Sequence, residues 1–277
     1  MCKVRLMPVA GAPVLLFLPA RDEVATVADV LARTPRVVTV DGCSHPVRTL
    51  VVDDGSTDGT GDAARACGAE VVRTDGLGLG AAVGIGLAWG ASVGAAAIAF
   101  CDADLEYDPA ELETLVRPVL AGTADYVVGS RFLGGARRMK PHRELGNRML
   151  TALTAASTAG RRSVPLTDGQ SGYRALSRDA AAAAVVAHDY NYAQVLTLDL
   201  LGRGFRYLEV PITYAHREVG RSFVRLPTYL RRVLPTMWRV RRSWAEPGRD
   251  ARRPLRVTRP GTDLGPVRDA PDVAGSV

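Results

Sequence analysis

Residues 96–104 read AAIAFCDAD, an apolar run that ends in two aspartates separated by one small residue. A short uncharged run of this kind is typical of a strand buried on both faces of a sheet. Polar residues directly after such a strand stand at its carboxyl end, the edge where open α/β sheets bind ligands. The stretch therefore predicts an α/β domain with Asp102 and Asp104 at a ligand-binding edge.

Further short apolar runs flank this stretch and alternate with segments of helical spacing. Strands are predicted at residues 14–18, 47–52, 70–73, 96–100 and 126–128, and helices at residues 22–31, 61–67, 81–92 and 108–120. Asp22 is a candidate N-cap, and Asp108 with Pro109 is a preferred helix start. Strands and helices that alternate at short spacing predict a mainly parallel sheet with helices on both faces.

The pattern changes after Arg131. Residues 132–180 are loop-rich, with a helix near residues 145–159 and a turn-rich DGQSGYRAL, and they precede a helix at 192–201 and an edge strand at 207–214. Residues 223–244 form a basic amphipathic segment, and residues 245–277 are rich in Pro, Gly, Arg and Asp. We predict one domain over residues 1–222, a separate amphipathic helical segment over 223–244 and a disordered tail over 245–277.

Composition excludes several classes of protein. The chain has 277 residues, of which 47% are hydrophobic, so a sizeable core is expected. The net charge of +6 comes almost entirely from arginine, a bias that a GC-rich genome also produces. The four cysteines form no CxxC pair, which argues against a zinc site or a disulfide framework and fits a reducing compartment. Residues 76–101 carry no charge, but seven glycines argue against a membrane span.

Acidic residues follow three of the predicted strands. Asp102 and Asp104 are hard oxygen ligands suited to Mg²⁺ or Mn²⁺, and such a metal can neutralise the charge on a departing diphosphate. DDGSTDGT at 53–60 offers acceptors for a nucleobase or a ribose, and PARDE at 19–23 adds a third acidic end. Each motif alone could be an ordinary turn. Three such ends in one sheet predict a site for a nucleotide and a metal.

Two other classes of function remain open from the residues. GLGLGA at 76–81 satisfies a dinucleotide fingerprint, with Asp102 at about the expected distance, which indicates a nicotinamide-dependent oxidoreductase. However, this stretch follows the third predicted strand, and no hydride-transfer set is evident. The C-terminal arginines alternatively indicate a non-catalytic binder of a membrane surface or nucleic acid. That class leaves the acidic strand ends unexplained, and we expect no nucleic-acid partner.

Taken together, the chain resembles the inverting family 2 glycosyltransferases, and among them the dolichyl- and polyprenyl-phosphate mannose or glucose synthases. The resemblance covers about residues 13–222. The matching motifs, in order, are LPARDE at 18–23, VVDDGSTDGT at 51–60, GLGLGAAVGIGL at 76–87, DADLEYDP at 102–109, GSRF at 129–132, DGQSGYRA at 168–175 and EVPITYAHREVGRS at 209–222.

The resemblance implies a GT-A fold and a metal-dependent, inverting transfer of a hexose from a GDP- or UDP-linked sugar to an acceptor. It implies that Pro19, Arg21 and Glu23 line the nucleotide pocket and that Val52 and Asp54 contact the base and ribose. It also implies that Asp102 and Asp104 bind Mg²⁺ or Mn²⁺, with the Ala103 backbone beside the sugar. Arg131 and Arg217 would contact phosphate. Three positions depart from the family's pattern. Arg21 stands where the family usually has an aromatic residue, and Phe223 stands where it usually has a lysine. A glutamate that is common on the helix near Gln194 is missing.

The acceptor is expected to be a polyprenyl phosphate. The hydroxyl of a soluble metabolite or glycan remains the alternative, and it would need a base, for which Asp168 is the candidate. The basic segment at 223–244, with Trp238 and Tyr229, could lie on a membrane surface or pack on the domain with its arginines outward. Pro227 and Pro235 are expected to bend or divide it. We expect a cytoplasmic enzyme, peripheral on the cytoplasmic face of the membrane.

Overall fold

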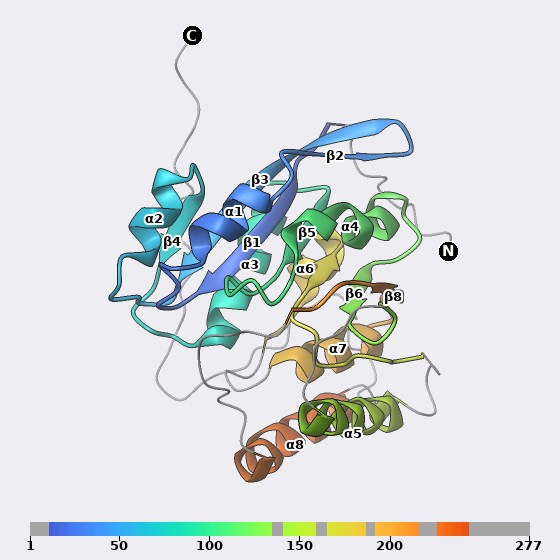
Figure 1. Ribbon diagram of the computed structural model, residues 1–277. Helices are drawn as coiled ribbons and strands as arrows, with labels where there is room; N and C mark the ends of the chain where they lie inside the picture. Colours follow the sequence, from blue (N-terminus) through green and yellow to red (C-terminus); the bar gives the residue numbers. More distant parts are fainter. Residues whose placement is uncertain (1–10, 135–140, 159–164, 187–191, 216–225, 244–277) are drawn as a thin grey trace.

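The computed structural model describes residues 11–134, 141–158, 165–186, 192–215 and 226–243, and a single mixed sheet forms its centre (Figure 1). The strands run in the spatial order β2-β3-β1-β5-β7-β6-β8, and β4 also pairs with β3. Their bounds are β1 Val14–Ala20, β2 Val37–Val40, β3 Cys43–Asp53, β4 Glu70–Arg73, β5 Ala97–Phe100, β6 Tyr126–Ser130, β7 Arg174–Leu176 and β8 Tyr207–Pro211.

The sheet is mainly parallel, as the sequence predicts. β1 pairs in parallel with both β3 and β5, and β8 pairs in parallel with β6 at one edge. One of two exceptions is β7, which lies antiparallel between β5 and β6. The sequence predicts only a turn-rich segment there, because three residues are too few to produce a recognisable alternation.

A β-hairpin also escapes the sequence prediction. β2 pairs antiparallel with the first part of β3, with Val40 opposite Cys43. The two residues between them, Asp41 and Gly42, both have positive φ, of 51° and 81°. An Asp-Gly turn of this kind is a preferred two-residue connection in hairpins.

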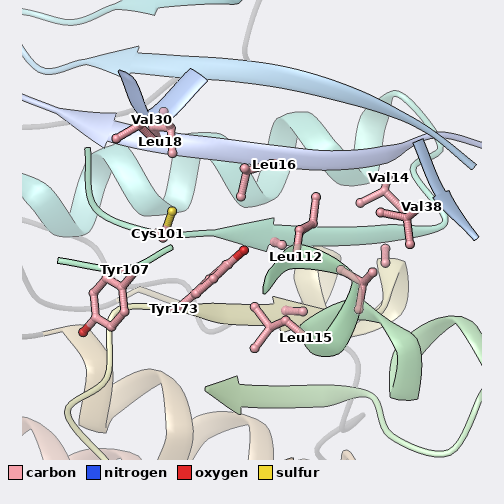
Figure 2. Close-up of a cluster of buried hydrophobic side chains, with 14 of the residues drawn as sticks. Val14, Leu16, Leu18, Val30, Val38, Cys101, Tyr107, Leu112, Leu115 and Tyr173 are labelled. Carbon is pink, nitrogen blue, oxygen red and sulfur yellow. The ribbon is translucent and has the colours of Figure 1, made fainter. Parts of the chain in front are cut away.

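Helices cover both faces of the sheet, and alternate residues of β1 point to the two sides. Leu16 and Leu18 pack in a cluster with helices α1, α2 and α4, whereas Leu15 and Phe17 pack in a second cluster with α3, α6 and α7 (Figure 2 shows the first cluster). The helix bounds are α1 Val27–Arg33, α2 Thr60–Ala66, α3 Leu79–Ser92, α4 Leu112–Leu120, α6 Arg178–Ala183 and α7 Tyr192–Gly202. This is the predicted α/β arrangement.

Two further helices, α5 Pro141–Thr158 and α8 Leu226–Ser243, form an outer layer beyond α7 (Figure 1). A small apolar cluster joins the three helices: Leu150 and Leu153 of α5, Val195 and Leu198 of α7, and Leu234, Met237 and Val240 of α8. Within the described chain, no helix is both long enough and apolar enough to span a bilayer. α5 and α8 therefore extend the second face of the sheet outward.

One local prediction is wrong, and another is wrong in part. Asp22 does not cap a helix, because α1 begins at Val27 and Asp22 adopts a positive φ of 54°. Pro235 does not divide the basic segment, since α8 is one helix that continues through it, and Pro227 occupies the second residue of that helix, where its missing N–H costs little. The predicted tail at 245–277 lies outside the described residues.

Candidate active site

The loops that follow β1 and β3 are tied together by hydrogen bonds. The amide of Asp22 donates to the Ser56 hydroxyl at 3.0 Å, and the Asp22 carboxylate accepts from the Thr57 amide at 2.8 Å. The amide of Glu23 donates to the Thr60 hydroxyl at 2.8 Å. Two of the predicted acidic strand ends therefore form one structural unit at the carboxyl edge of the sheet.

Asp54 fastens the glycine-rich loop to the end of β3. Its buried carboxylate accepts from the Thr74 hydroxyl at 2.6 Å and from the Gly78 amide at 2.8 Å. A side chain at Gly55 could not fit, because its Cβ would lie 2.9 Å from the amide nitrogen of Gly76. The contact of Asp54 with a base or ribose stays a prediction, and it would use the lone pairs that these two bonds leave.

The stretch that satisfies a dinucleotide fingerprint is placed unlike a dinucleotide site. It follows β4, which among the described strands pairs only with β3 at the outside of the sheet. The Gly78 amide at the start of α3 is bonded to Asp54, whereas a dinucleotide site directs such amides at the pyrophosphate. This geometry argues against the oxidoreductase.

Other residues predicted to line the nucleotide pocket lie at the same edge. Pro19 and Val52 are buried and are partners in the register of β1 and β3. The Val52 side chain packs in the core, so its backbone is the part that a nucleotide can contact. Arg21 is exposed, and a nitrogen of its guanidinium lies 3.7 Å from the position of a Cβ on Gly76, so Arg21 lies beside the glycine-rich loop.

Asp102 and Asp104 leave the end of β5 as predicted, on either side of the buried Ala103. Burial, followed by the charges of Asp104 and Glu106, raises the pKa of Asp102 to about 8, and the nearby Arg131 opposes the shift. Asp104 also accepts the backbone amide of Glu106 at 3.0 Å, which shapes the turn after β5. Negative groups are thus concentrated here, and a bound cation would stabilise their ionised form.

The described residues contain no cluster of three or more His, Cys, Asp or Glu side chains placed to hold a metal ion. Asp102 and Asp104 can therefore supply two carboxylate ligands, with the remaining positions left to water or to substrate. Mg²⁺ is commonly bound in this way, by one or two carboxylates together with phosphate oxygens. The donor set fits a divalent metal that is completed by a nucleotide diphosphate.

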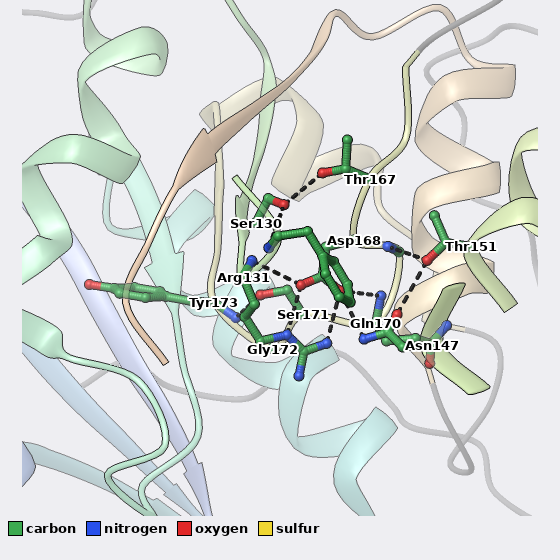
Figure 3. A network of polar contacts seen from close by, with 12 residues as sticks. Ser130, Arg131, Asn147, Thr151, Thr167, Asp168, Gln170, Ser171, Gly172 and Tyr173 are labelled. Atoms are coloured by element: carbon green, nitrogen blue, oxygen red, sulfur yellow. Dashed lines mark hydrogen bonds and ion pairs between the residues drawn. The ribbon is translucent and has the colours of Figure 1, made fainter. Parts of the chain in front are cut away.

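Arg131 and Asp168 form a buried, bidentate ion pair (Figure 3), and the charge of Arg131 acts on Asp102. Arg131 donates from Nε at 2.7 Å, from Nη2 at 2.8 Å and from its backbone amide at 3.0 Å. Burial alone would raise the pKa of Asp168, but the hydrogen bonds and charge of Arg131 outweigh it and lower the pKa. The guanidinium also lies over the ring of Tyr214, 5.1 Å from its centroid. Arg131 is therefore held in one orientation.

Helix α5 supports this pair from the other side. Asn147 donates from its side-chain nitrogen to Asp168 at 3.2 Å, and the Thr151 hydroxyl accepts the amide of Gly169 at 3.0 Å (Figure 3). The amide of Gln170 also donates to Asp168, at 3.3 Å. With these bonds both oxygens of Asp168 are engaged, so this carboxylate is better placed to orient Arg131 than to take up a proton. Its predicted role as a base stays untested.

Glu209 and Arg174 shape the same loop, and the sequence prediction assigned neither a role. Glu209 of β8 accepts the amides of Thr167 and Asp168 at 2.9 Å and 3.2 Å, together with the Tyr207 hydroxyl at 2.5 Å. Arg174 is fully buried and donates to the carbonyls of Ser171 and Gly169, at 2.8 Å and 3.1 Å. A charged residue inside the otherwise apolar predicted strand at 207–214 is a signal that could have identified Glu209, whereas Arg174 lies in a segment that the sequence does not mark as a strand.

The acidic end and the Arg131 end of the site meet at Gly172. A Cβ at this position would lie 2.7 Å from an oxygen of the Asp102 carboxylate, so the carboxylate packs directly on the loop that Asp168 begins. The Gly172 amide donates to the Tyr107 hydroxyl at 2.7 Å, which fixes the loop against the turn after β5. Of the predicted site residues, Arg217 lies outside the described part of the chain.

Comparison with known proteins agrees with this geometry. Residues 17–183 match Glycosyl transferase family 2. The chain is 37% identical over 188 residues to the polyprenol monophosphomannose synthase of Mycolicibacterium smegmatis, covering 64% of this chain and 69% of that protein. It is 32% identical over 219 residues to the undecaprenyl-phosphate mannosyltransferase of Micrococcus luteus, covering 76% and 86%.

Solved structures show the same fold. The glucosyl-3-phosphoglycerate synthase of Mycobacterium tuberculosis, crystallised with Mn²⁺, UDP and glucosyl-3-phosphoglycerate, superimposes with a TM-score of 0.65 at 26% identity. The match covers 83% of this chain and 80% of that one. The fold is thus the GT-A fold that the resemblance implies. By sequence and by fold, the chain belongs to glycosyl transferase family 2.

Proposed function

We propose that the protein transfers a hexose from a GDP- or UDP-linked sugar to a polyprenyl phosphate, with Mg²⁺ or Mn²⁺ bound between Asp102, Asp104 and the donor diphosphate. The observation that carries the proposal is the pairing of opposite charges at one sheet edge. The Asp102 carboxylate lies against Gly172. Arg131, in the loop after β6, is close enough for its positive charge to lower the pKa of Asp102. Such a site can bind a metal and a phosphate side by side.

Each part of this edge has a place in the reaction. The loops after β1 and β3, with Arg21, Glu23 and Asp54, would bind the nucleoside. Asp102 and Asp104 would hold the metal, which when bound supplies charge neutralisation to the departing diphosphate. Arg131, together with Arg217, would bind the phosphate of the acceptor or the donor.

The bonding of Asp168 favours a phosphate acceptor. A lipid phosphate is already an anion near neutral pH, so it can attack the anomeric carbon from the face opposite the nucleotide without a base. A hydroxyl acceptor would need a proton acceptor. Asp168 has a lowered pKa, and its carboxylate oxygens accept hydrogen bonds from Arg131 and Asn147, so Asp168 is a weak proton acceptor. Arg131, held rigidly by Asp168, is instead suited to phosphate.

A soluble phosphorylated metabolite is the second candidate acceptor. It is favoured by the likeness to the glucosyl-3-phosphoglycerate synthase, whose product in the crystal carries a phosphate. Arg131 would bind the phosphate of either acceptor, but the soluble metabolite would accept the sugar on a hydroxyl and would therefore need a base. The two acceptors also differ in whether the enzyme must reach a membrane, for which the exposed arginines of α8 are the supporting feature.

The test is a transfer assay with purified full-length protein, GDP- and UDP-linked mannose and glucose, Mn²⁺ and two acceptors. The acceptors are a polyprenyl phosphate in vesicles and 3-phosphoglycerate in solution. We expect lipid-linked hexose that requires Mn²⁺ and is lost in Asp104→Asn. Product on 3-phosphoglycerate alone would transfer the assignment to the second candidate, and no product from any donor would overturn the proposal.

A further inference from the structure

The hydroxyl group of Tyr107 uses only its acceptor side within the protein. It accepts the amide of Gly172 at 2.7 Å, and because the N–H is the donor, the hydroxyl proton takes no part in that bond. A phenol carries one donor besides its acceptor lone pairs. Within the part of the chain that the structure describes, no side chain and no carbonyl accepts this proton. The O–H of Tyr107 is therefore a donor without an acceptor.

The burial of Tyr107 gives this free donor its significance. Tyr107 is 3% exposed, so bulk water does not surround its hydroxyl. A buried polar group without a partner is costly, and native structures keep few of them unless a ligand or a water completes the bond. Burial also raises the pKa of Tyr107 well above its ordinary value, so the hydroxyl keeps its proton at neutral pH.

Tyr107 lies next to the metal end of the candidate active site. A Cβ on Gly172 would lie 2.7 Å from an oxygen of the Asp102 carboxylate and 3.1 Å from the ring carbon Cε2 of Tyr107. Asp102 and Tyr107 therefore pack against one residue, and the Tyr107 hydroxyl is bonded to the amide of that residue. The two side chains make no hydrogen bond with each other in the described structure, so the Asp102 carboxylate does not accept the Tyr107 proton.

Tyr107 also lies next to the phosphate end of the site. Its ring meets that of Tyr214 edge-on, with the centroids 5.9 Å apart, and the guanidinium of Arg131 lies over the same Tyr214 ring, 5.1 Å from its centroid. After burial, the charge of Arg131 acts most strongly on the pKa of Tyr107, followed by that of Asp102. The hydroxyl thus adjoins both the carboxylate that we assign to the metal and the cation that we assign to phosphate.

The neighbouring aromatic residue has no such free donor. Tyr173 packs against Tyr107 with the ring centroids 6.0 Å apart, and its hydroxyl donates to the carbonyl of Pro109 at 3.4 Å. Figure 2 shows Tyr107 at the end of the apolar cluster, with its hydroxyl directed away from the labelled apolar side chains. Packing of the ring therefore holds the Tyr107 hydroxyl toward the polar side of the cluster.

We infer that the Tyr107 hydroxyl donates a hydrogen bond to a phosphate oxygen of the substrate, between the bound metal and Arg131. Hydrogen bonds to an ionised acceptor are the strong ones, and a phosphate that contacts both a metal on Asp102 and the guanidinium of Arg131 would lie beside Tyr107. A neutral donor adds affinity there without repelling the metal. The inference rests on the proposed function. The oxygen belongs to the donor diphosphate or to the acceptor phosphate, and the experiment distinguishes these two sources.

The experiment compares Tyr107→Phe with the matched control Tyr173→Phe in the full chain. Each variant removes one buried hydroxyl from the same aromatic cluster and keeps the ring. Calorimetry gives the Kd of GDP and of UDP in Mn²⁺, and a transfer assay gives kcat and KM for polyprenyl phosphate and for 3-phosphoglycerate. Thermal unfolding checks that each variant is folded, and its shift with Mn²⁺ in the absence of nucleotide reports binding of the metal alone.

We expect Tyr107→Phe to lose about tenfold or more, the effect of one hydrogen bond to a charged group. The loss appears in the Kd of the nucleotide if the donor diphosphate accepts the bond, and in kcat/KM for the acceptor, with nucleotide binding unchanged, if the acceptor phosphate does. In both cases the stabilisation by Mn²⁺ alone should equal that of the wild type. Tyr173→Phe should behave like the wild type in every measurement.

Three results overturn the inference. Wild-type nucleotide binding and transfer in Tyr107→Phe would mean that water satisfies the proton. A weaker effect of Mn²⁺ alone in Tyr107→Phe would mean that Tyr107 only shapes the loop against Asp102, and an equal loss in Tyr173→Phe would mean that the cluster acts through packing. These results remove the inference alone, whereas a wild type that neither binds GDP or UDP nor transfers a hexose removes the proposed function as well.

Discussion

Arg131 and Asp168 are joined by three hydrogen bonds, two from the guanidinium and one from the backbone amide of Arg131. The two residues are 37 positions apart in the chain and both are buried. The pair links the end of β6 to the loop before β7, and Asn147 of α5 adds a fourth bond. The orientation of the cation that we assign to phosphate therefore depends on an anion that need not contact substrate.

Removing that anion should cost both stability and acceptor binding. Asp168→Ala leaves a buried guanidinium without its partner, and we expect the free energy of unfolding to fall by about 3 kcal/mol. Denaturant unfolding measures this. Asp62→Ala is the matched control, because its pair with Arg65 is exposed and should contribute less than about 1 kcal/mol. Equal losses in the two variants would contradict a structural role for the buried pair.

The conservative change Asp168→Asn separates orientation from base catalysis. Asparagine keeps one hydrogen-bond acceptor for Arg131, so we expect nucleotide binding to persist. The KM for a lipid phosphate should rise about tenfold, because one charge-assisted hydrogen bond to Arg131 is lost. The pH profile of kcat should keep its shape. A kcat that falls without a change in KM, together with the loss of a titrating group from the profile, would make Asp168 a base.

Gly172→Ala should disturb the metal site while leaving the core intact. The new Cβ would lie 2.7 Å from the Asp102 carboxylate, so that side chain or the loop must shift. We expect the Mn²⁺-dependent part of nucleotide binding to weaken at least tenfold, as followed by calorimetry. Gly146→Ala on α5 is the control, because its Cβ meets nothing within 4 Å and alanine favours a helix. If the metal dependence of nucleotide binding is unchanged in Gly172→Ala, the position of the Asp102 carboxylate does not depend on the loop that contains Gly172.

The raised pKa of Asp102 predicts a pH dependence of stability in the metal-free protein. The native state keeps this proton up to about pH 8, whereas the unfolded chain releases it near the ordinary value of 3.8. The native state thus binds more protons between these values, and the free energy of unfolding should fall as pH rises through that range. Asp102→Asn should flatten the slope relative to the wild type in EDTA.

Metal should reverse this trend. Because a carboxylate must lose its proton to ligate a cation, the stabilisation by Mn²⁺ should grow as pH approaches 8. Thermal unfolding across pH with EDTA or Mn²⁺ measures both effects. The interpretation fails if Asp102→Asn has the same slope as the wild type.

The sequence predicts those parts of the structure that depend on local pattern. The apolar runs at 14–18 and 96–100 locate β1 and β5, and the aspartates that follow them lie at the carboxyl edge. The β2–β3 hairpin escapes the prediction although Asp41-Gly42 is a strong turn signal, because β2 and the first part of β3 are partly exposed and form no continuous apolar run. β7 escapes the prediction for a different reason. Its three residues form a strand through their pairing with β5 on one side and β6 on the other, and a local sequence pattern does not contain this information.

The contacts that define the phosphate end of the site could not be predicted. The resemblance implies that Arg131 binds phosphate, but no local pattern indicates that Asp168 holds it or that Asn147 supports both. Each contact joins segments brought together by the sheet order. The same applies to Glu209, which lies inside a matching motif but acts on Thr167, 42 residues away.

The most direct test of the central claim is calorimetric titration of the full chain with GDP and with UDP, in Mn²⁺ and in EDTA, for wild type and Asp104→Asn. We predict that at least one nucleotide binds the wild type tightly in Mn²⁺ and weakly in EDTA, that Asp104→Asn binds weakly in both, and that NAD does not bind. Equal binding by wild type and Asp104→Asn in Mn²⁺, or binding of NAD with neither GDP nor UDP, would contradict the account.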